Sequence, residues 1–166
     1  MDTENLTQAQ AKEKIKSMAL DIDFAMLESN LGGRPTHIIP MSTKKVDDQG
    51  RIWFLSNATS EHNRNIERDN NIQLIYSSPG DMKFMSLYGE AVITKDAVVI
   101  DELYGKLDDT WFEGKNDPNV SAIAFTPMDG HYWDTKYNKL VSLIKMGAGV
   151  ITGKMQDLGT QGDLDV

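Results

Sequence analysis

The feature that most limits the fold of this chain is a series of short strand-like runs with turn residues between them. Each run is rich in apolar residues and ends close to Gly, Pro, Asn, Asp or Ser. The runs cover residues 24–29, 36–42, 51–56, 71–76, 83–94 and 120–126. Few helical patterns interrupt them, and this arrangement is typical of antiparallel barrels. The sequence therefore predicts a mainly β fold with peripheral helices, built on a six-stranded antiparallel barrel.

Helical patterns occur at three places beside these strands. The first covers residues 7–23, where Thr7 can cap the helix and apolar residues recur at helical spacing. Ser60 and Asp96 are expected to cap two further short helices, because their side-chain oxygens can accept the unpaired N–H groups of a first turn. Gly89, in the middle of the longest strand-like run, predicts a bulge.

The chain is expected to form one domain. Its length of 166 residues is enough to bury a core, and no linker or internal repeat divides it. After Gly153, the residues Gly, Gln, Thr and Asp dominate. We therefore predict a single domain over residues 1–153 and a flexible tail over residues 154–166.

The net charge restricts the partners of the protein. It is -8 at pH 7, with a pI near 4.8, and an acidic surface repels nucleic acid and anionic membranes. No apolar run approaches the length of a membrane span, and the first residues contain no apolar signal region. We expect neither nucleic acid nor membrane as a partner, and by default a cytoplasmic location.

Several kinds of catalytic chemistry lack the residues that they need. The chain has no cysteine, which excludes disulfides, thiolate nucleophiles and cysteine-based metal sites. Its three histidines, His37, His62 and His131, are far apart in the sequence and show no spacing typical of metal ligands. Nucleophile-elbow, Walker and dinucleotide-binding motifs are also missing. We expect no metal site, and we single out no residue as a general acid or base.

The segment from Gly33 to Ile66 contains a possible anion site. Two strand-like runs, the second ending in Ser56, are followed by a helix whose first turn carries hydroxyl, imidazole and guanidinium groups. Unpaired N–H groups and the helix dipole favour an anion at such a helix N-terminus. All four arginines of the chain also precede residue 69: Arg34, Arg51, Arg64 and Arg68.

In its order of residues, this segment resembles the first half of the pyridoxamine-phosphate-oxidase-like, FMN-binding split-barrel proteins. The general stress protein branch is the most similar. The resemblance extends from about residue 24 to residue 151 and includes the run 83–91, Trp111-Phe112 followed by Gly114, and Tyr132-Trp133-Asp134. It implies that the barrel is a split barrel.

The resemblance also implies positions for a flavin. The implied contacts are Pro40, Met41 and Ser42 along the ring, Phe54, Leu55 and Ser56 near the ribityl chain and phosphate, Ser60, His62 and Asn63 at the phosphate, and Trp111 and Trp133 near a dimer interface. His62 stands where many members of the family have lysine. Taken singly, each of these residues is also explained as a core residue, a helix cap or a surface residue.

The function that the resemblance implies is that of an FMN-dependent oxidoreductase of the general stress protein type. The flavin would be shared across a homodimer and would react with a small-molecule electron donor and acceptor. Synthesis of pyridoxal phosphate is not expected, because the true oxidases hold their substrate with a C-terminal Arg-x-His element. This chain has no arginine after Arg68.

Three alternatives remain open at this stage. The protein could bind flavin without turnover, as a stress-linked sensor or cofactor buffer. The same cleft could hold a deazaflavin or heme, with His37 or His131 as the spare axial ligand for heme. A barrel without any cofactor is the third alternative.

Overall fold

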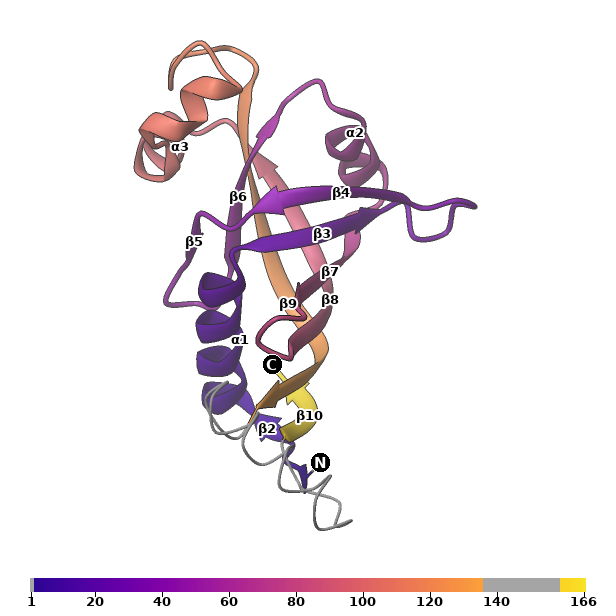
Figure 1. The fold of residues 1–166 in the computed structure, drawn as a ribbon. Helices are drawn as coiled ribbons and strands as arrows, with labels where there is room; N and C mark the ends of the chain where they lie inside the picture. The colour runs from indigo at the N-terminus through magenta and orange to yellow at the C-terminus, as the bar shows by residue number, and fades with distance from the viewer. Residues whose placement is uncertain (1, 136–158) are drawn as a thin grey trace.

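A computed structural model of the chain describes residues 2–135 and 159–166. The described residues form a ten-stranded sheet with three α-helices and one 3-10 helix around it (Figure 1). The strands are β1 (Asp2–Thr3), β2 (Leu6–Thr7), β3 (Phe24–Ser29), β4 (His37–Ser42), β5 (Lys45–Val46), β6 (Ile52–Asn57), β7 (Asn71–Ser78), β8 (Lys83–Thr94), β9 (Val120–Thr135) and β10 (Gly159–Asp165). The helices are α1 (Gln8–Ile22), α2 (Glu61–Arg68), α3 (Ala97–Leu103) and the 3-10 helix η1 (Lys106–Thr110).

Six of the strands form a split barrel. Their order is β4–β3–β7–β8–β9–β6, and every neighbouring pair in it is antiparallel. The ends of this series, β4 and β6, are in contact, but in the described residues no hydrogen-bonded ladder joins them. The mainly β split barrel expected from the sequence is thus confirmed, and the other four strands extend the sheet beyond the barrel.

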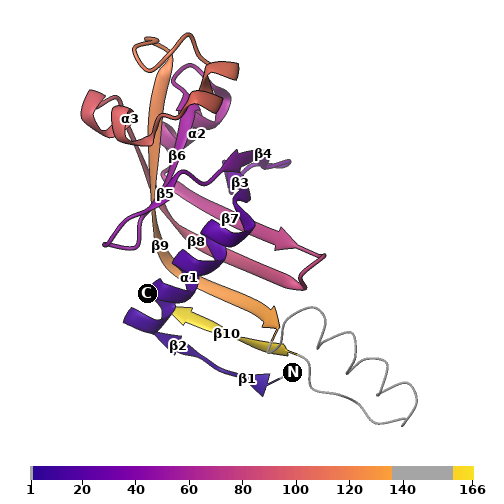
Figure 2. The same cartoon turned by 60° about the vertical axis from the view of Figure 1, so that its left-hand side comes forward.

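The core lies between the inner face of the sheet and α1. Strands of a half-buried sheet alternate inward and outward residues, and here Leu74, Tyr76, Met85 and Leu87 all point inward and are buried. The buried face of α1 joins the same cluster through Ile15 and its helical neighbours. Figure 2 shows α1 running across β7, β8 and β9 toward β10. The helix covers the inner face of this part of the sheet (Figure 2), whereas Ile75 and Phe84 on the outer face are exposed.

The predicted local signals are largely confirmed. Ser60 and Asp96 each accept a hydrogen bond from the first turn of α2 and α3, respectively. Thr7 occupies the cap position of α1, but its side chain makes no capping hydrogen bond. A register shift at Gly89 forms the expected bulge, where a Cβ atom would lie only 2.1 Å from the carbonyl oxygen of Thr126. Only glycine fits at such a distance.

Two predictions about the C-terminal half are wrong. The expected tail over residues 154–166 is a strand from Gly159 to Asp165, which pairs with β9, while residues 154–158 lie outside the described residues. Leu164 of this strand is only 1% exposed, and ladders to β1, β2 and β9 hold this polar stretch in the sheet. The run expected to end at Thr126 also continues to Thr135. Pro127 is tolerated there because it lies at the bulge opposite Gly89.

None of the helices in the two described ranges is long and apolar enough to cross a membrane.

Candidate functional site

The first turn of α2 brings three of the predicted phosphate residues together. The Oγ atom of Ser60 accepts a hydrogen bond from the backbone N–H of Asn63 at 3.3 Å and lies 3.0 Å from Nε2 of His62. Buried Ile66 holds the helix against the barrel core. Ser60 and His62 therefore lie side by side at the N-terminus of a helix that the core keeps in place.

His62 is neutral in this environment. Burial, and to a lesser extent the nearby charge of His37, lower its pKa to about 4. The two imidazole rings are stacked, with centroids 6.3 Å apart and planes 11° apart. His37 also lies 3.8 Å from a carboxylate oxygen of Glu61, so its ring is placed between an acidic and a neutral partner.

A positive charge at this end of α2 comes from Arg64. Its guanidinium group donates a hydrogen bond to the carbonyl oxygen of Thr59 at 2.5 Å, which folds the side chain back toward the beginning of the helix. Thr59 is itself fixed, because its N–H and hydroxyl both donate to the side chain of Asn57. The sequence places the Arg64 guanidinium in the first turn of this helix, with a solvated helix face as the alternative. The hydrogen bond to Thr59 depends on the local turn, which no residue pattern reports.

A buried polar network lies beneath this turn. The side-chain N–H of Asn63 donates to Oγ of Ser121 at 2.9 Å, and the hydroxyls of Ser121 and Ser56 are 2.8 Å apart. These contacts tie α2 to β6 and β9. Ser56 and Asn63 are therefore engaged inside the barrel, although the Oδ1 atom of Asn63 is buried without a hydrogen-bond partner among the described residues. Because Oδ1 of Asn63 and the oxygens of a phosphate are both hydrogen-bond acceptors, this atom cannot contribute to an anion site.

The remaining predicted contacts on β4 and β6 divide between core and surface. Met41 and Phe54 are buried in the barrel core, and Leu55 packs in a second cluster against α3. Pro40 is exposed, and the half-buried Ser42 donates a hydrogen bond to Asp23 at 3.0 Å. The side chains of Pro40 and Ser42 thus face outward, where a ligand could reach the edge of β4.

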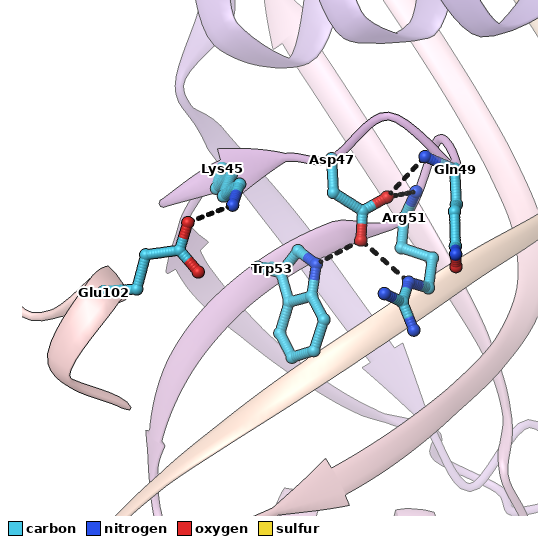
Figure 3. Close-up of polar contacts among 6 residues, drawn as sticks. All are labelled: Lys45, Asp47, Gln49, Arg51, Trp53 and Glu102. Carbon is cyan, nitrogen blue, oxygen red and sulfur yellow. Dashed lines mark hydrogen bonds and ion pairs between the residues drawn. The ribbon is translucent and has the colours of Figure 1, made fainter. Parts of the chain in front are cut away.

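The hairpin of β5 and β6 is fixed by one carboxylate (Figure 3). Asp47 accepts hydrogen bonds from the backbone N–H groups of Gln49 and Arg51, from the Arg51 guanidinium and from the Trp53 indole. Burial alone would raise the pKa of Asp47, but these donors outweigh it and lower the pKa. Lys45 in the same hairpin pairs with Glu102 of α3. The network positions β6, and with it the strand end that leads to α2.

The outer face of the sheet carries an apolar surface. Neighbouring strands place its residues in register: Met26 lies opposite both Pro40 and Ile75, and Phe84 lies opposite Trp133. We call the set the apolar sheet face, and its members are each at least 37% exposed: Phe24, Met26, Ile38, Ile75 and Phe84. Exposed apolar side chains gathered on one face of a protein often mark an interaction site.

The two predicted tryptophans lie outside the group of residues at the first turn of α2, and Trp133 is far from it (Figure 1). Trp133 is on the part of β9 that pairs with β10, at the opposite end of the sheet from α2 (Figure 1). Trp111 follows η1 and is 81% exposed. Within one chain, therefore, Trp133 does not adjoin the first turn of α2, and Trp111 is exposed to solvent.

The pairing of His131 with Asp163, at the edge of the apolar sheet face, was not predicted from the sequence. Nδ1 of His131 lies 2.7 Å from Oδ1 of Asp163, and the His131 ring is 4.5 Å from the Trp133 ring between centroids. The pair joins β9 to β10 and could not be foreseen while β10 was expected to be a tail. Both histidines considered as heme ligands, His37 and His131, thus contact carboxylates. Residues 2–135 and 159–166 contain no cluster of three histidine or acidic side chains that could hold a metal ion.

Comparison with known proteins gives one family match. The sequence model of the family described as pyridoxamine 5'-phosphate oxidase like matches residues 10–157. A search of curated proteins found no match.

Solved structures show the same fold. A structure assigned to general stress protein 26 from Jannaschia sp. CCS1 has a TM-score of 0.80 at 24% identity, covering 95% of this chain and 99% of that one. The general stress FMN/FAD binding protein from Xanthomonas citri gives 0.65 at 22% identity over 77% and 90% of the two chains. General stress protein 26 from Bacillus anthracis str. Sterne gives 0.63 at 20%, over 73% and 92%. At these identities the likeness concerns the fold alone.

Proposed function

Because this chain belongs to the pyridoxamine 5'-phosphate oxidase-like family, we propose that it is an FMN-binding homodimeric oxidoreductase of the general stress protein type. The observation that carries the proposal is the first turn of α2, where Ser60, His62 and the Arg64 guanidinium gather at a helix N-terminus. Hydroxyl, imidazole and guanidinium groups together with helix N–H groups are the donors that a phosphate requires.

These donors fit a phosphate in spite of the neutral His62. Arg64 supplies a permanent positive charge, since guanidinium remains protonated in proteins. A bound dianion would favour the protonated form of His62 and so oppose the burial that now keeps it neutral. Glu61 faces His37 on the other side, and its side chain is 63% exposed, so solvent screens its repulsion.

The apolar sheet face supports the homodimer. Five exposed apolar side chains on adjoining strands leave a surface that a second copy of this chain could cover. The outward edge of β4 at Pro40 and Ser42 borders this surface. A flavin ring held along that edge would lie at the junction between two protomers.

The separation of Trp133 from α2 also supports a shared site. Since one chain cannot bring Trp133 to its own phosphate site, a contact between this side chain and the flavin requires the second protomer. Trp133 lies opposite Phe84 of the apolar sheet face, so dimerisation through that face would carry it toward the partner.

In this proposal, bound FMN supplies hydride and electron transfer between a small-molecule donor and an acceptor. The chain itself anchors the phosphate through Ser60, His62 and Arg64, and excludes water from the ring by its apolar sheet face. We do not expect pyridoxal-phosphate synthesis, because no arginine follows Arg68.

The absorption spectrum of the purified protein, before and after addition of FMN and removal of the excess, tests this function. Flavin bands with quenched fluorescence, together with a dimeric mass by light scattering, are the expected result. A Soret band would indicate heme instead. A colourless protein whose melting temperature FMN does not raise would contradict the proposal. Retained flavin that neither NADH nor NADPH reduces would favour a binding module without turnover.

A further inference from the structure

His131 and Asp163 belong to a row of side chains that crosses the outer face of the sheet. Ser86 of β8 lies directly opposite His131 of β9, and His131 lies directly opposite Asp163 of β10. Directly opposite residues on one face have Cβ atoms roughly 5 Å apart. A hydroxyl, an imidazole and a carboxylate therefore stand next to one another on three adjoining strands.

The contact with Asp163 determines which nitrogen of His131 carries the proton. An ionised carboxylate can only accept hydrogen bonds, so the 2.7 Å contact requires a proton on Nδ1 of His131. In the neutral ring, the lone pair then resides on Nε2. Among the described residues, no group forms a hydrogen bond with Nε2, and the His131 side chain is 34% exposed. Within residues 2–135 and 159–166, the ring thus offers a partly exposed acceptor without a partner, and its orientation is fixed by Asp163.

The neighbours of His131 favour a flat aromatic ligand. The Trp133 ring packs against the imidazole at an angle of 57°, and Phe84, opposite Trp133, is 37% exposed. Offset or tilted packing against such rings stabilises another aromatic ring. A ligand that is already anionic before it binds is disfavoured, because Asp163 adjoins the site and the whole chain carries a net charge of -8. A neutral ligand that passes a proton to His131 leaves the net charge of the site unchanged.

Ser86 completes the set of polar groups. Its Oγ atom accepts a hydrogen bond from the Gln73 side chain at 2.8 Å, so its own hydroxyl hydrogen remains to be donated. A ligand oxygen between Ser86 and His131 would have one donor and one acceptor at hand. This combination suits a phenolic hydroxyl, which can give up a proton and then accept a hydrogen bond.

We propose that His131, held by Asp163, is the acid–base group of a site for phenol- or quinol-type ligands whose ring packs on Trp133. In the proton transfer, the ligand O–H bond breaks and an N–H bond forms at Nε2. Asp163 balances the charge of the resulting imidazolium, and Ser86 donates to the phenolate oxygen. No electron moves in this step. The inference rests on the proposed function, in which a quinol would be the small-molecule electron donor.

The test uses 4-fluorophenol as a probe, because its ¹⁹F resonance reports both binding and ionisation without interference from flavin absorption. The full chain as purified, the variants His131→Gln and Asp163→Asn, and the control Asp129→Asn are compared. Asp129 is an exposed acidic residue on the same strand, and among the described residues its carboxylate accepts a hydrogen bond from the backbone N–H of Gly130 alone. Retention of FMN and the melting temperature are recorded for every protein.

With the wild type and Asp129→Asn, the resonance of the bound probe should shift toward that of the phenolate. His131→Gln and Asp163→Asn should lose this shift and bind the probe roughly tenfold more weakly or worse, as expected for a lost hydrogen bond to a charged group. Equal shifts and affinities in all four proteins, or no binding by the wild type, would overturn the inference. A wild type that retains no FMN but binds the probe would contradict the proposed function and leave the phenol site supported.

Discussion

Ser60 Oγ lies 3.0 Å from Nε2 of His62, and the same hydroxyl caps α2 by accepting the N–H of Asn63. One side chain thus both begins the helix and contacts the imidazole at its N-terminus. The burial of the imidazole at this position keeps its pKa near 4, so His62 is neutral at pH 7. The candidate phosphate site therefore contains a histidine that behaves as a polar neutral group until an anion binds.

The neutral His62 predicts a dependence of stability on pH. Its pKa is about 4 in the folded chain, against about 6.5 when unfolded. Between these values the unfolded chain binds the additional proton, so this group's contribution to stability is complete above pH 6.5 and is lost as pH falls toward 4. Urea unfolding of the wild type and His62→Gln at several pH values checks this. The wild type should lose more stability than the variant over that interval, and parallel curves would contradict the assignment.

Replacing His62 by lysine should strengthen FMN binding. A lysine would place a permanent charge in the first turn of α2, without the energetic cost of protonating a buried imidazole. We expect roughly a several-fold to tenfold lower Kd at pH 7. Quenching of FMN fluorescence measures it, with His62→Gln as the neutral comparison. Equal affinities of His62→Lys and His62→Gln would remove this position from the phosphate site.

Two arginines of α2 provide a matched comparison. Arg64 reaches back to Thr59 at the N-terminus, whereas Arg68 is in the last turn. Arg64→Gln should weaken FMN binding roughly tenfold or more, because it removes a charge-assisted contact, and Arg68→Gln should change it little. Titrations with FMN and with riboflavin, which lacks the phosphate, distinguish the causes. The loss should appear for FMN only, and an equal loss for both ligands would count against a phosphate contact.

Asp47 should be important for stability rather than binding. Its carboxylate accepts four hydrogen bonds, and its side chain is only 13% exposed. Asp47→Ala leaves the Trp53 indole and two backbone N–H groups without their acceptor, which should cost about 1–3 kcal/mol of unfolding free energy. Because the folded pKa is lowered, the contribution is present above about pH 4 and is lost at lower pH. Urea denaturation at pH 7 and pH 3 measures both effects.

The barrel could be predicted because its determinants are local. Alternating residues, the caps Ser60 and Asp96, and Gly89 at the bulge are each visible within a few positions of sequence. β10 could not be predicted, since it has one buried apolar residue, Leu164, and its partner strands β1, β2 and β9 are distant in sequence. Sequence order places Ser60, His62 and Asn63 together, but the pairing of His131 with Asp163 arises from that long-range strand contact.

The apolar sheet face predicts how the dimer can be broken. Ile75 is at the centre of this face, opposite Met26, and is 39% exposed. In a dimer, Ile75→Glu would place one negative charge from each protomer in a desolvated interface. The variant should therefore be monomeric, because an unpaired buried charge is strongly unfavourable. Val98 on α3 is 78% exposed and outside the face, so Val98→Glu is the control and should remain dimeric.

Light scattering of both variants measures the oligomeric state, and the flavin spectrum measures cofactor retention. If the flavin is shared, the monomeric Ile75→Glu variant should no longer retain FMN, since Trp133 of one protomer could no longer reach the α2 site of the other. Monomers that retain FMN with unchanged affinity would mean that one chain forms the whole site. A dimeric Ile75→Glu protein would instead direct the search for the interface to another surface, such as that around α3.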